Sequence, residues 1–437
     1  MRLLTFKGGV HPPGKKELAR EQKIQIFPIP KTVYVFLSNH AGAPAKCVVK
    51  QEDRVKTGQI IGEPSGFISA YVHSPLTGVV KSIEKIYHPV HGKPMEAVVI
   101  EQTDNEEEWE LLERKVWESS SKEEILEIIK KAGIVGLGGA MFPTHVKLSP
   151  PPEKRIDTLI INGAECEPYL TIDYRLMLEN AEEMLQGILI TMKVLSVKEA
   201  HVGIESNKMD AVQHLRKVFK NTPIKVHALK TKYPQGAEKQ LIHAITKRKV
   251  PAGGLPMDVG VVVQNVGTII AIKKAVVDGM PLVERGLTVT GEAITKPFNA
   301  IVRIGTPISQ LLEAGGITED AERVILGGPM MGIAVNRLET PVLKGTSGIT
   351  ALRASKPWEE KPCIRCGKCI TACPMGLEPY LLNLLSSKKR YDDAVNNGLL
   401  NCIECGSCAY NCPSKIDHVR SIKLAKKVYL ALRGGKK

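Results

Sequence analysis

The sequence predicts a multidomain protein of mixed α/β and β modules that ends in an α-helical, cysteine-rich domain. The chain has 437 residues, which is more than one hydrophobic core usually organises. Short β segments closed by Gly and Pro come first, and apolar β-like runs then alternate with helical stretches. Eight of the ten cysteines fall at regular spacing from Cys363 onward. These three patterns indicate separate modules, each with its own core.

Composition excludes several classes of protein. The hydrophobic share is 43% and the charged share is 24%, values typical of globular domains. The longest apolar stretch, Val259–Ile272, is interrupted by Gln264 and Asn265 and is shorter than the roughly 20 residues that a membrane helix needs. The N-terminus lacks the apolar core of a secretory signal. We therefore expect an intracellular protein that does not cross a membrane.

The net charge of +14 indicates an anionic partner. Nucleic acid is one candidate, but no nucleic-acid recognition motif accompanies the charge, and we expect no nucleic acid partner. A bound prosthetic group of negative charge is the alternative that the cysteines favour.

An N-terminal extension, residues 1–32, precedes a small all-β module at residues 33–105. Two segments of this module, Asp53-Arg-Val-Lys-Thr-Gly-Gln-Ile-Ile-Gly and Ser74-Pro-Leu-Thr-Gly-Val-Val, resemble the barrel-sandwich fold of biotinyl and lipoyl carriers. No hairpin Lys occurs in the sequence context that those carriers modify. We therefore expect a barrel-sandwich hybrid that is a structural relative without a swinging arm.

Residues 121–285 predict an α/β domain. Ser121 and Glu124 form a capping box before an amphipathic helix that ends at Gly133. Apolar runs then alternate with helical stretches such as Leu176–Val194. This order is expected of a mainly parallel sheet covered by helices.

The last third of the chain predicts two further modules. Residues 286–340 have a compact β-β-α-β pattern, and we interpret residues 344–362 as a polar linker. Residues 355–420 hold the cysteine runs, and residues 421–437 predict a basic C-terminal helix.

The two cysteine runs share the spacing Cys-x2-Cys-x2-Cys-x3-Cys-Pro, beginning at Cys363 and at Cys402. This is the spacing of bacterial two-cluster ferredoxins, in which three thiolates bind one cubane and the fourth Cys, directed away by Pro, binds the other. Structural zinc is the alternative, but the third Cys of each run and the absence of a nearby His disfavour it. We expect two [4Fe–4S] clusters, one held by Cys363, Cys366, Cys369 and Cys412, the other by Cys402, Cys405, Cys408 and Cys373.

Gly136-Leu-Gly-Gly-Ala-Met-Phe-Pro-Thr, followed by Lys147, is a glycine-rich loop in which backbone N–H groups can approach a phosphate. Alone it is a weak signal, because glycine-rich turns are more often structural. Three later loops strengthen it: Asn162-Gly-Ala-Glu-Cys-Glu-Pro, Tyr233-Pro-Gln-Gly-Ala-Glu and Val263-Gln-Asn-Val-Gly-Thr. Loops at the strand ends of an α/β sheet converge on a ligand crevice.

These four segments resemble the flavin-binding subunit of respiratory complex I and of NAD-linked hydrogenases. The resemblance implies a Rossmann-type flavin domain with FMN and NAD(H) as cofactors. The FMN phosphate and ribityl chain would be held by Gly136, Gly138, Gly139, Ala140 and Lys147. Contacts to the isoalloxazine or ribityl groups would come from Asn162, Glu165, Asn265 and Thr268. Catalytic residues facing the dinucleotide would be Phe142, Glu167 and Glu238.

The sequence departs from the complex I pattern at several polar positions, namely Leu137, Ala164, Tyr169, Ala237 and Gly267. We therefore expect fewer polar contacts to the flavin and the dinucleotide than in that protein. Cys166 lies between two glutamates that disfavour a thiolate, so we expect a small residue near the flavin and no nucleophile.

The order of the modules resembles the C subunits of Rnf-type ion-translocating electron-transport complexes over nearly the full chain. The opening Phe6-Lys-Gly-Gly-Val-His-Pro-Pro strengthens this resemblance. It implies a β-grasp (SLBB-like) module at residues 286–340 and a two-[4Fe–4S] ferredoxin domain at residues 355–420.

The same resemblance implies a peripheral subunit on the cytoplasmic side of the cell inner membrane, bound to the membrane-embedded subunits of an Rnf-type complex. It would pass electrons between NAD(H), FMN and the two clusters, with ferredoxin as an indirect partner and Na⁺ or H⁺ moved elsewhere. A cobalamin reductase, which shares several modules in another order, and an electron relay without NAD chemistry are the alternatives.

Overall fold

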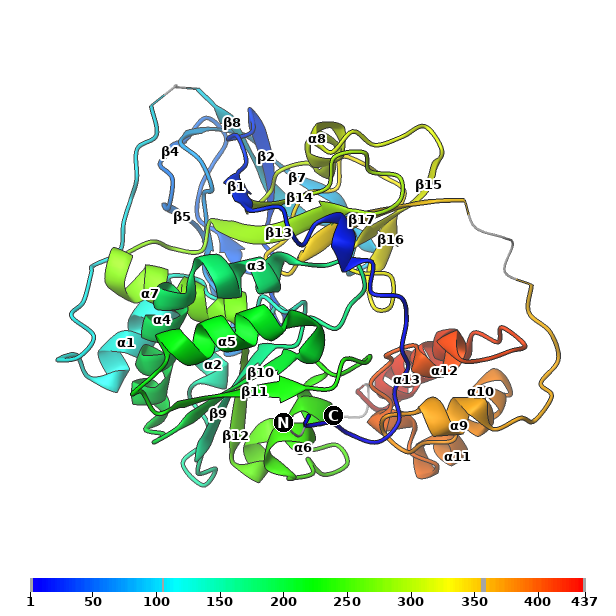
Figure 1. Ribbon diagram of the computed structural model, residues 1–437. Coiled ribbons are helices and arrows are strands. Elements are labelled where there is room, and N and C mark those ends of the chain that lie inside the picture. The colour runs from blue at the N-terminus through cyan, green and yellow to red at the C-terminus, as the bar shows by residue number, and fades with distance from the viewer. Residues whose placement is uncertain (1–2, 104–105, 355–358, 435–437) are drawn as a thin grey trace.

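The computed structural model describes residues 3–103, 106–354 and 359–434 (Figure 1). Four predicted domain boundaries, at residues 1, 105, 355 and 437, lie outside the described residues. The predicted fold class is confirmed, because β, α/β and helical units follow one another along the chain.

The β module consists of two antiparallel sheets. The larger sheet has the strand order β2 (Thr32–Phe36), β8 (Lys93–Gln102), β7 (Gly78–His88) and β4 (Arg54–Val55). The smaller sheet has the order β3 (Lys46–Cys47), β5 (Ile60–Glu63) and β6 (Val72–His73). Branched side chains of both sheets, such as Val35, Ile61 and Ile100, fill one core.

The α/β domain is built on a four-stranded parallel sheet, as predicted. Its strand order is β11 (Ile224–Leu229), β10 (Ala200–Glu205), β9 (Thr158–Gly163) and β12 (Val261–Asn265). Helices cover both faces, which explains why the strands are almost continuously apolar. On one face α6 (Glu238–Thr246) packs through Leu241 and Ile242. The other face is covered by α1 (Lys122–Lys131), α3 (Ile172–Glu179), α4 (Ala181–Leu195), α5 (Met209–Val218) and α7 (Val266–Asp278).

The predicted start of α1 is confirmed. Glu124 N donates to Ser121 Oγ at 3.2 Å and Ser121 N donates to Glu124 Oε2 at 2.8 Å. This reciprocal pair satisfies two N–H groups that the helix itself cannot bond. The short helix α2 (Thr144–Lys147) then follows the glycine loop.

A six-stranded sheet contains more of the chain than the predicted β-β-α-β module. Its order is β1 (Ile24–Ile26), β14 (Phe298–Arg303), β13 (Glu284–Thr290), β17 (Gly348–Arg353), β15 (Ala321–Leu326) and β16 (Ile333–Val335), and α8 (Ile308–Ala314) packs on it. Our interpretation of residues 344–362 as a linker was therefore wrong in part. Ile349 and Ala351 of β17 are fully buried between neighbouring strands, although the polar residues around them resemble a linker.

The C-terminal domain is helical, with α9 (Lys368–Ala372), α10 (Pro379–Ser387), α11 (Tyr391–Asn396), α12 (Ser407–Tyr410) and α13 (His418–Gly434). Leu382, Leu385, Ile422 and Ala425 form its core. Figure 1 shows that the N-terminal extension runs from the α/β domain past this helical domain before it reaches β1. Among the described helices, none combines the length and the apolar composition that a bilayer span requires.

Candidate functional site

The glycine loop lies between α1 and α2 and closes on itself. Gly136 N donates to Phe142 O at 2.9 Å, and Met141 N donates to Gly136 O at 3.1 Å. The loop tip, residues 138–140, is exposed. Gly139 has φ of +105°, and a Cβ there would meet no atom within 4 Å. The tip therefore offers bare backbone beside open space, as a phosphate-binding loop requires.

The start of α7 supports this loop. Leu137 N donates to Thr268 Oγ1 at 2.9 Å. Asn265, the N-cap of α7, accepts from Gly267 N at 2.9 Å and donates to Asp173 Oδ2 at 2.7 Å. The structure thus brings the glycine loop next to Asn265 and Thr268, two of the predicted flavin contacts.

Asn162 lies near the end of strand β9 and faces the loop before α6. Its Nδ2 donates to Gly236 O at 2.8 Å, and Gly236 N donates to Cys166 Sγ at 3.3 Å. Burial raises the pKa of the Cys166 thiol to about 12, and the nearby Glu205 carboxylate adds to the shift. The thiol therefore stays protonated, in agreement with our expectation that it is not a nucleophile.

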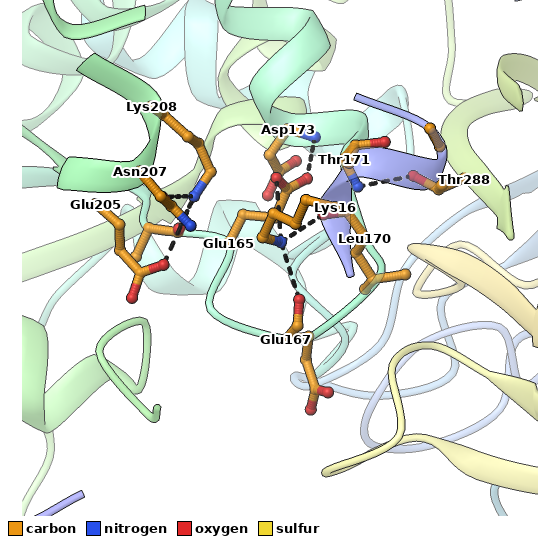
Figure 2. Close-up of polar contacts among 12 residues, drawn as sticks. Lys16, Glu165, Glu167, Leu170, Thr171, Asp173, Glu205, Asn207, Lys208 and Thr288 are labelled. Carbon is orange, nitrogen blue, oxygen red and sulfur yellow. Dashed lines mark hydrogen bonds and ion pairs between the residues drawn. The ribbon is translucent and has the colours of Figure 1, made fainter. Parts of the chain in front are cut away.

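Glu165 lies in a buried cluster of charged groups that Figure 2 shows in close-up. Lys16, from the N-terminal extension, reaches into the loop after β9 and donates through Nζ to the carbonyl oxygens of Glu167 at 2.9 Å and Leu170 at 2.5 Å. Its Nζ lies 3.8 Å from Glu165 Oε2, and Asp173 N donates to Glu165 Oε1 at 2.7 Å. Burial raises the pKa of Glu165 to about 7, although the charge of Lys16 opposes the shift.

Glu167 is turned away from that cluster, and its carboxylate holds the 327–332 loop of the six-stranded sheet module. Met330 N donates to Oε2 at 3.0 Å and Met331 N to Oε1 at 2.8 Å. A Cβ on Gly328 would lie 2.3 Å from Glu167 Oε2 and 2.8 Å from Glu167 Cβ, so a larger residue here would displace the Glu167 side chain. Burial raises the pKa of Glu167 to about 7, and the two N–H donors oppose the shift.

Lys147 and Glu238, which we assigned to the phosphate and to the dinucleotide, form one ion pair. Lys147 Nζ lies 2.7 Å from Glu238 Oε1. Phe142 is half-buried at the base of the glycine loop. The structure therefore brings Lys147, at the end of α2, to Glu238, at the start of α6, while Phe142 contacts Gly136 through its backbone.

Sequence reasoning missed three buried polar residues of this site. Lys16 carries no local signal, because its partners follow about 150 residues later. Lys208 donates to Ala164 O at 2.8 Å and stands 3.6 Å from Glu205 Oε2, with both side chains 2% exposed. Gln235 is the third missed residue, and it lies in the Tyr233-Pro-Gln-Gly-Ala-Glu loop, which we had singled out as a motif without assigning a role to the glutamine.

Four thiols of the predicted second cluster border one cavity. Cys373, Cys402, Cys405 and Cys408 line one small cavity of about 20 Å³, together with apolar side chains that include Leu377, Leu382, Val419 and Ile422. Burial raises the pKa of Cys402 to about 11 and also raises the pKa values of Cys405 and Cys408, and the Cys373 thiol adds to each shift. The interleaved set thus borders one apolar pocket.

The thiols of the other predicted set lie nearer the surface. Cys363 and Cys366 are exposed, Cys369 is buried and Cys412 is partly buried. Burial raises the pKa of Cys369, and the neighbouring Cys412 contributes to the shift. Across the parts of the chain that the structure describes, no three His, Cys, Asp or Glu side chains surround a point as ligands of a single ion would.

The residues present fit both kinds of prosthetic group. The glycine loop is open, while Glu165 Oε2 and both amide atoms of Gln235 are buried without a hydrogen-bond partner among the described residues. These atoms can accept or donate a hydrogen bond to a polar ligand, and Glu165 Oε2 can do so beside its ion pair with Lys16. The thiol-lined cavity suits a cubane, because iron deprotonates its thiol ligands and an apolar surrounding favours a cluster shielded from water.

Comparison with known proteins supports each module. Four family models match: the RnfC barrel sandwich hybrid domain over residues 4–106, the Nuo51 FMN-binding domain over 129–274, the SLBB domain over 287–334 and a 4Fe-4S dicluster domain over 358–413. The expected FMN-binding and dicluster domains are thereby confirmed.

A solved structure of an NAD⁺-reducing [NiFe]-hydrogenase in the air-oxidised state is similar to this chain in fold. Its TM-score is 0.50 at 17% identity, and the match covers 70% of this chain and 61% of that one. At this identity the likeness concerns the fold alone.

Curated relatives match over most of their length. The C subunit of the proton-translocating ferredoxin:NAD(+) oxidoreductase complex of Clostridium ljungdahlii is 48% identical, over 90% of this chain and 86% of the relative. The C subunit of the Na(+)-translocating complex of Acetobacterium woodii is 44% identical over 98% of both chains. The C subunit of the ion-translocating oxidoreductase complex of Rhodobacter capsulatus is 43% identical, over 98% of this chain and 83% of the relative. The resemblance noted from the motifs is confirmed, and the chain belongs to the family of C subunits of ion-translocating oxidoreductase complexes of the Rnf type.

Proposed function

We propose that this chain is the electron-transferring C subunit of an ion-translocating ferredoxin:NAD oxidoreductase complex. It exchanges electrons between NAD(H), FMN and two [4Fe–4S] clusters. The observation that carries the proposal is a buried apolar contact. Cys405 of the thiol-lined cavity and Tyr233 of the flavin loops pack in one cluster, with Cys166 at its edge. Two prosthetic groups at these places would be separated only by packed side chains.

FMN would be held by the glycine loop from one side and by the strand-end loops from the other. Gly136, Gly138, Gly139 and Ala140 offer backbone to the phosphate and ribityl chain. Asn162, Glu165, Asn265 and Thr268 would contact the isoalloxazine or ribityl groups. Lys147 would supply positive charge to the phosphate, and this contact would draw the Lys147 side chain away from Glu238.

The dinucleotide would approach along Phe142 and Glu238. Glu238 is well placed for this, because 38% of its side chain is exposed. Glu167 holds the N–H groups of Met330 and Met331, so its contact with the dinucleotide requires the 327–332 loop to move.

FMN held by these loops would supply the chemistry that links a donor of one hydride, which carries two electrons, to clusters that each accept one electron at a time. The protein supplies placement and proton control. Glu165 and Glu167 both have pKa values raised to about 7, so either carboxyl can hold or release a proton near neutrality. The apolar lining of the cavity around Cys402, Cys405 and Cys408 would limit the contact of a bound cluster with water.

We place the chain at the cytoplasmic side of the cell inner membrane, where it binds the membrane-embedded subunits of the complex. Those subunits would move Na⁺ or H⁺, and ferredoxin would exchange electrons with this chain indirectly. The relatives from Clostridium ljungdahlii and Acetobacterium woodii, which are named for such complexes, support this placement in an assembly.

An anaerobic reconstitution tests the proposal. The purified chain is loaded with iron, sulfide and FMN, desalted and mixed with NADH, and the flavin absorbance and the reduced-cluster signal are followed. We expect one FMN per chain, iron for two cubanes and flavin bleaching by NADH. Bound FMN that never responds to NADH would favour the relay. Faster reduction of added cobalamin than of ferredoxin would favour a cobalamin reductase.

A further inference from the structure

We propose that the N-terminal segment Phe6–Val10 is a strap that fixes the helical domain against the flavin loops, and that it thereby selects the cluster of Cys373, Cys402, Cys405 and Cys408 as the electron partner of the flavin. This inference rests on the proposed function. It assigns a role to the Phe-Lys-Gly-Gly-Val motif, which neither the α/β domain nor the cysteine runs contain.

The strap is bonded to the flavin loops on one side. Val10 and Tyr233 form an antiparallel bridge, with both N–H···O distances at 2.8 Å. Lys232 Nζ donates to Phe6 O at 2.5 Å and to Gly8 O at 2.7 Å, and it lies 3.8 Å from the centroid of the Phe6 ring. Lys232 is 8% exposed, so these bonds are shielded from water.

The same strap is bonded to the helical domain on its other side. Gly9 N donates to Ala372 O at 2.9 Å, one residue before Cys373. A Cβ on Gly8 would lie 2.7 Å from Cys373 O, and a Cβ on Gly9 would lie 2.6 Å from Tyr233 O. Both neighbours are backbone atoms and cannot turn aside. The two glycines are therefore needed because two domains approach the strap from opposite sides.

Val10, Tyr233, Ala372 and Cys405 share one buried cluster, so the strap completes the contact between the crevice and the thiol-lined cavity. Gln240 also joins the domains directly, because its Nε2 donates to Pro374 O at 3.3 Å and to Met375 Sδ at 3.0 Å. The exposed Cys363 and Cys366 belong to the other set. Each electron from the flavin would thus enter first the cluster of Cys373, Cys402, Cys405 and Cys408, beside Tyr233. Two such transfers would follow each hydride. The cluster of Cys363, Cys366, Cys369 and Cys412 would then pass the electron to a partner.

The test compares holo chains that carry Gly8→Ala, Gly9→Ala or Lys232→Met. Two controls are matched to the glycine changes. Gly253→Ala shares the positive φ, +70°, but its Cβ meets no atom within 4 Å. Gly14→Ala lies in the same N-terminal extension, and its Cβ meets only the Lys16 side chain at 3.9 Å. Lys232→Met avoids any new backbone clash and serves where a glycine variant fails to fold.

We expect the strap variants to keep FMN, iron and flavin bleaching by NADH, but to lose hydrogen-exchange protection at Gly9 and around Ala372. The rate at which the cluster signal follows flavin bleaching should fall by about tenfold or more, which corresponds to about 1.4 kcal/mol in barrier. Hydrogen-exchange protection and cluster-reduction rates equal to those of the control variants would overturn the proposal that Phe6–Val10 acts as a strap. If the wild-type chain itself shows no response to NADH, the proposed function fails, while the exchange comparison still decides whether the strap docks the domain.

Discussion

Replacement of Lys16 by Met should destabilise the flavin site strongly. The Lys16 side chain is 11% exposed and that of Glu165 is 4% exposed, so their interaction is little screened. Lys16→Met removes the two N–H···O bonds to the carbonyls of Glu167 and Leu170 and leaves Glu165 without its nearest positive charge. Methionine has similar length, so the change removes charge and donors without opening a cavity.

The magnitude follows from these contacts. A hydrogen bond from a charged donor contributes about 1.5–3 kcal/mol, and breaking a buried pair costs about 3–5 kcal/mol. Glu165 can take up a proton, because burial already raises its pKa to about 7, and this limits the cost. We expect a loss of about 3 kcal/mol in the free energy of unfolding and weaker FMN binding.

Urea unfolding of the holo chain at neutral pH, followed by circular dichroism and flavin fluorescence, measures this loss. Lys15→Met is the matched control, because Lys15 is 43% exposed and lies 4.0 Å from Glu292, and we expect it to change stability by less than about 0.5 kcal/mol. A Lys16→Met variant as stable as Lys15→Met would refute the assignment of Lys16 as the positioning residue of this loop.

Three further predictions concern single side chains. Thr268→Val removes the hydroxyl that accepts the hydrogen bond from Leu137 N, so FMN affinity measured by fluorescence titration should fall about fivefold. An unchanged affinity would show that this bond does not shape the glycine loop. The protonated form of Glu165 is favoured in the folded chain, so its contribution to stability is fully present below the unfolded pKa and is lost as pH rises through about 7. Glu165→Gln should therefore gain stability relative to wild type between about pH 5 and pH 8, by at most about 3 kcal/mol. Parallel stability curves for the two chains against pH would contradict this. Cys405→Ala should lose about one cluster of iron in a chemical assay while Cys47→Ala keeps both, and equal iron in the two variants would remove Cys405 from the ligand set.

Local patterns predicted much of this molecule. The capping box of Ser121 and Glu124 starts α1 because its partners are three residues apart. The cysteine spacing indicated the interleaved grouping in which Cys373 faces Cys402, because the geometry of a two-cluster ferredoxin is encoded in short gaps. The apolar runs of β9 and β12 predicted a buried parallel sheet, because each run is a local pattern within a single strand.

Long-range contacts could not be predicted in this way. Lys16 is one of several lysines in a polar extension, and only the folded chain places it against Glu167 and Leu170. β17 was concealed because the segment around it is polar, although most of its own side chains are buried. The pairing of Lys147 with Glu238 joins two residues that we had assigned to different ligands, and no spacing in the chain links them.

The central claim is that a hydride enters at the flavin and leaves as single electrons through the cluster beside Tyr233. Rapid mixing of the anaerobic holo chain with NADH, followed by freeze-quench paramagnetic resonance at successive times, tests it most directly. We predict that flavin bleaching comes first and that the cluster signal follows, and that Cys405→Ala bleaches normally but loses this early signal. Reduction of the clusters in a chain that lacks FMN, or an early signal that survives in Cys405→Ala, would contradict the claim.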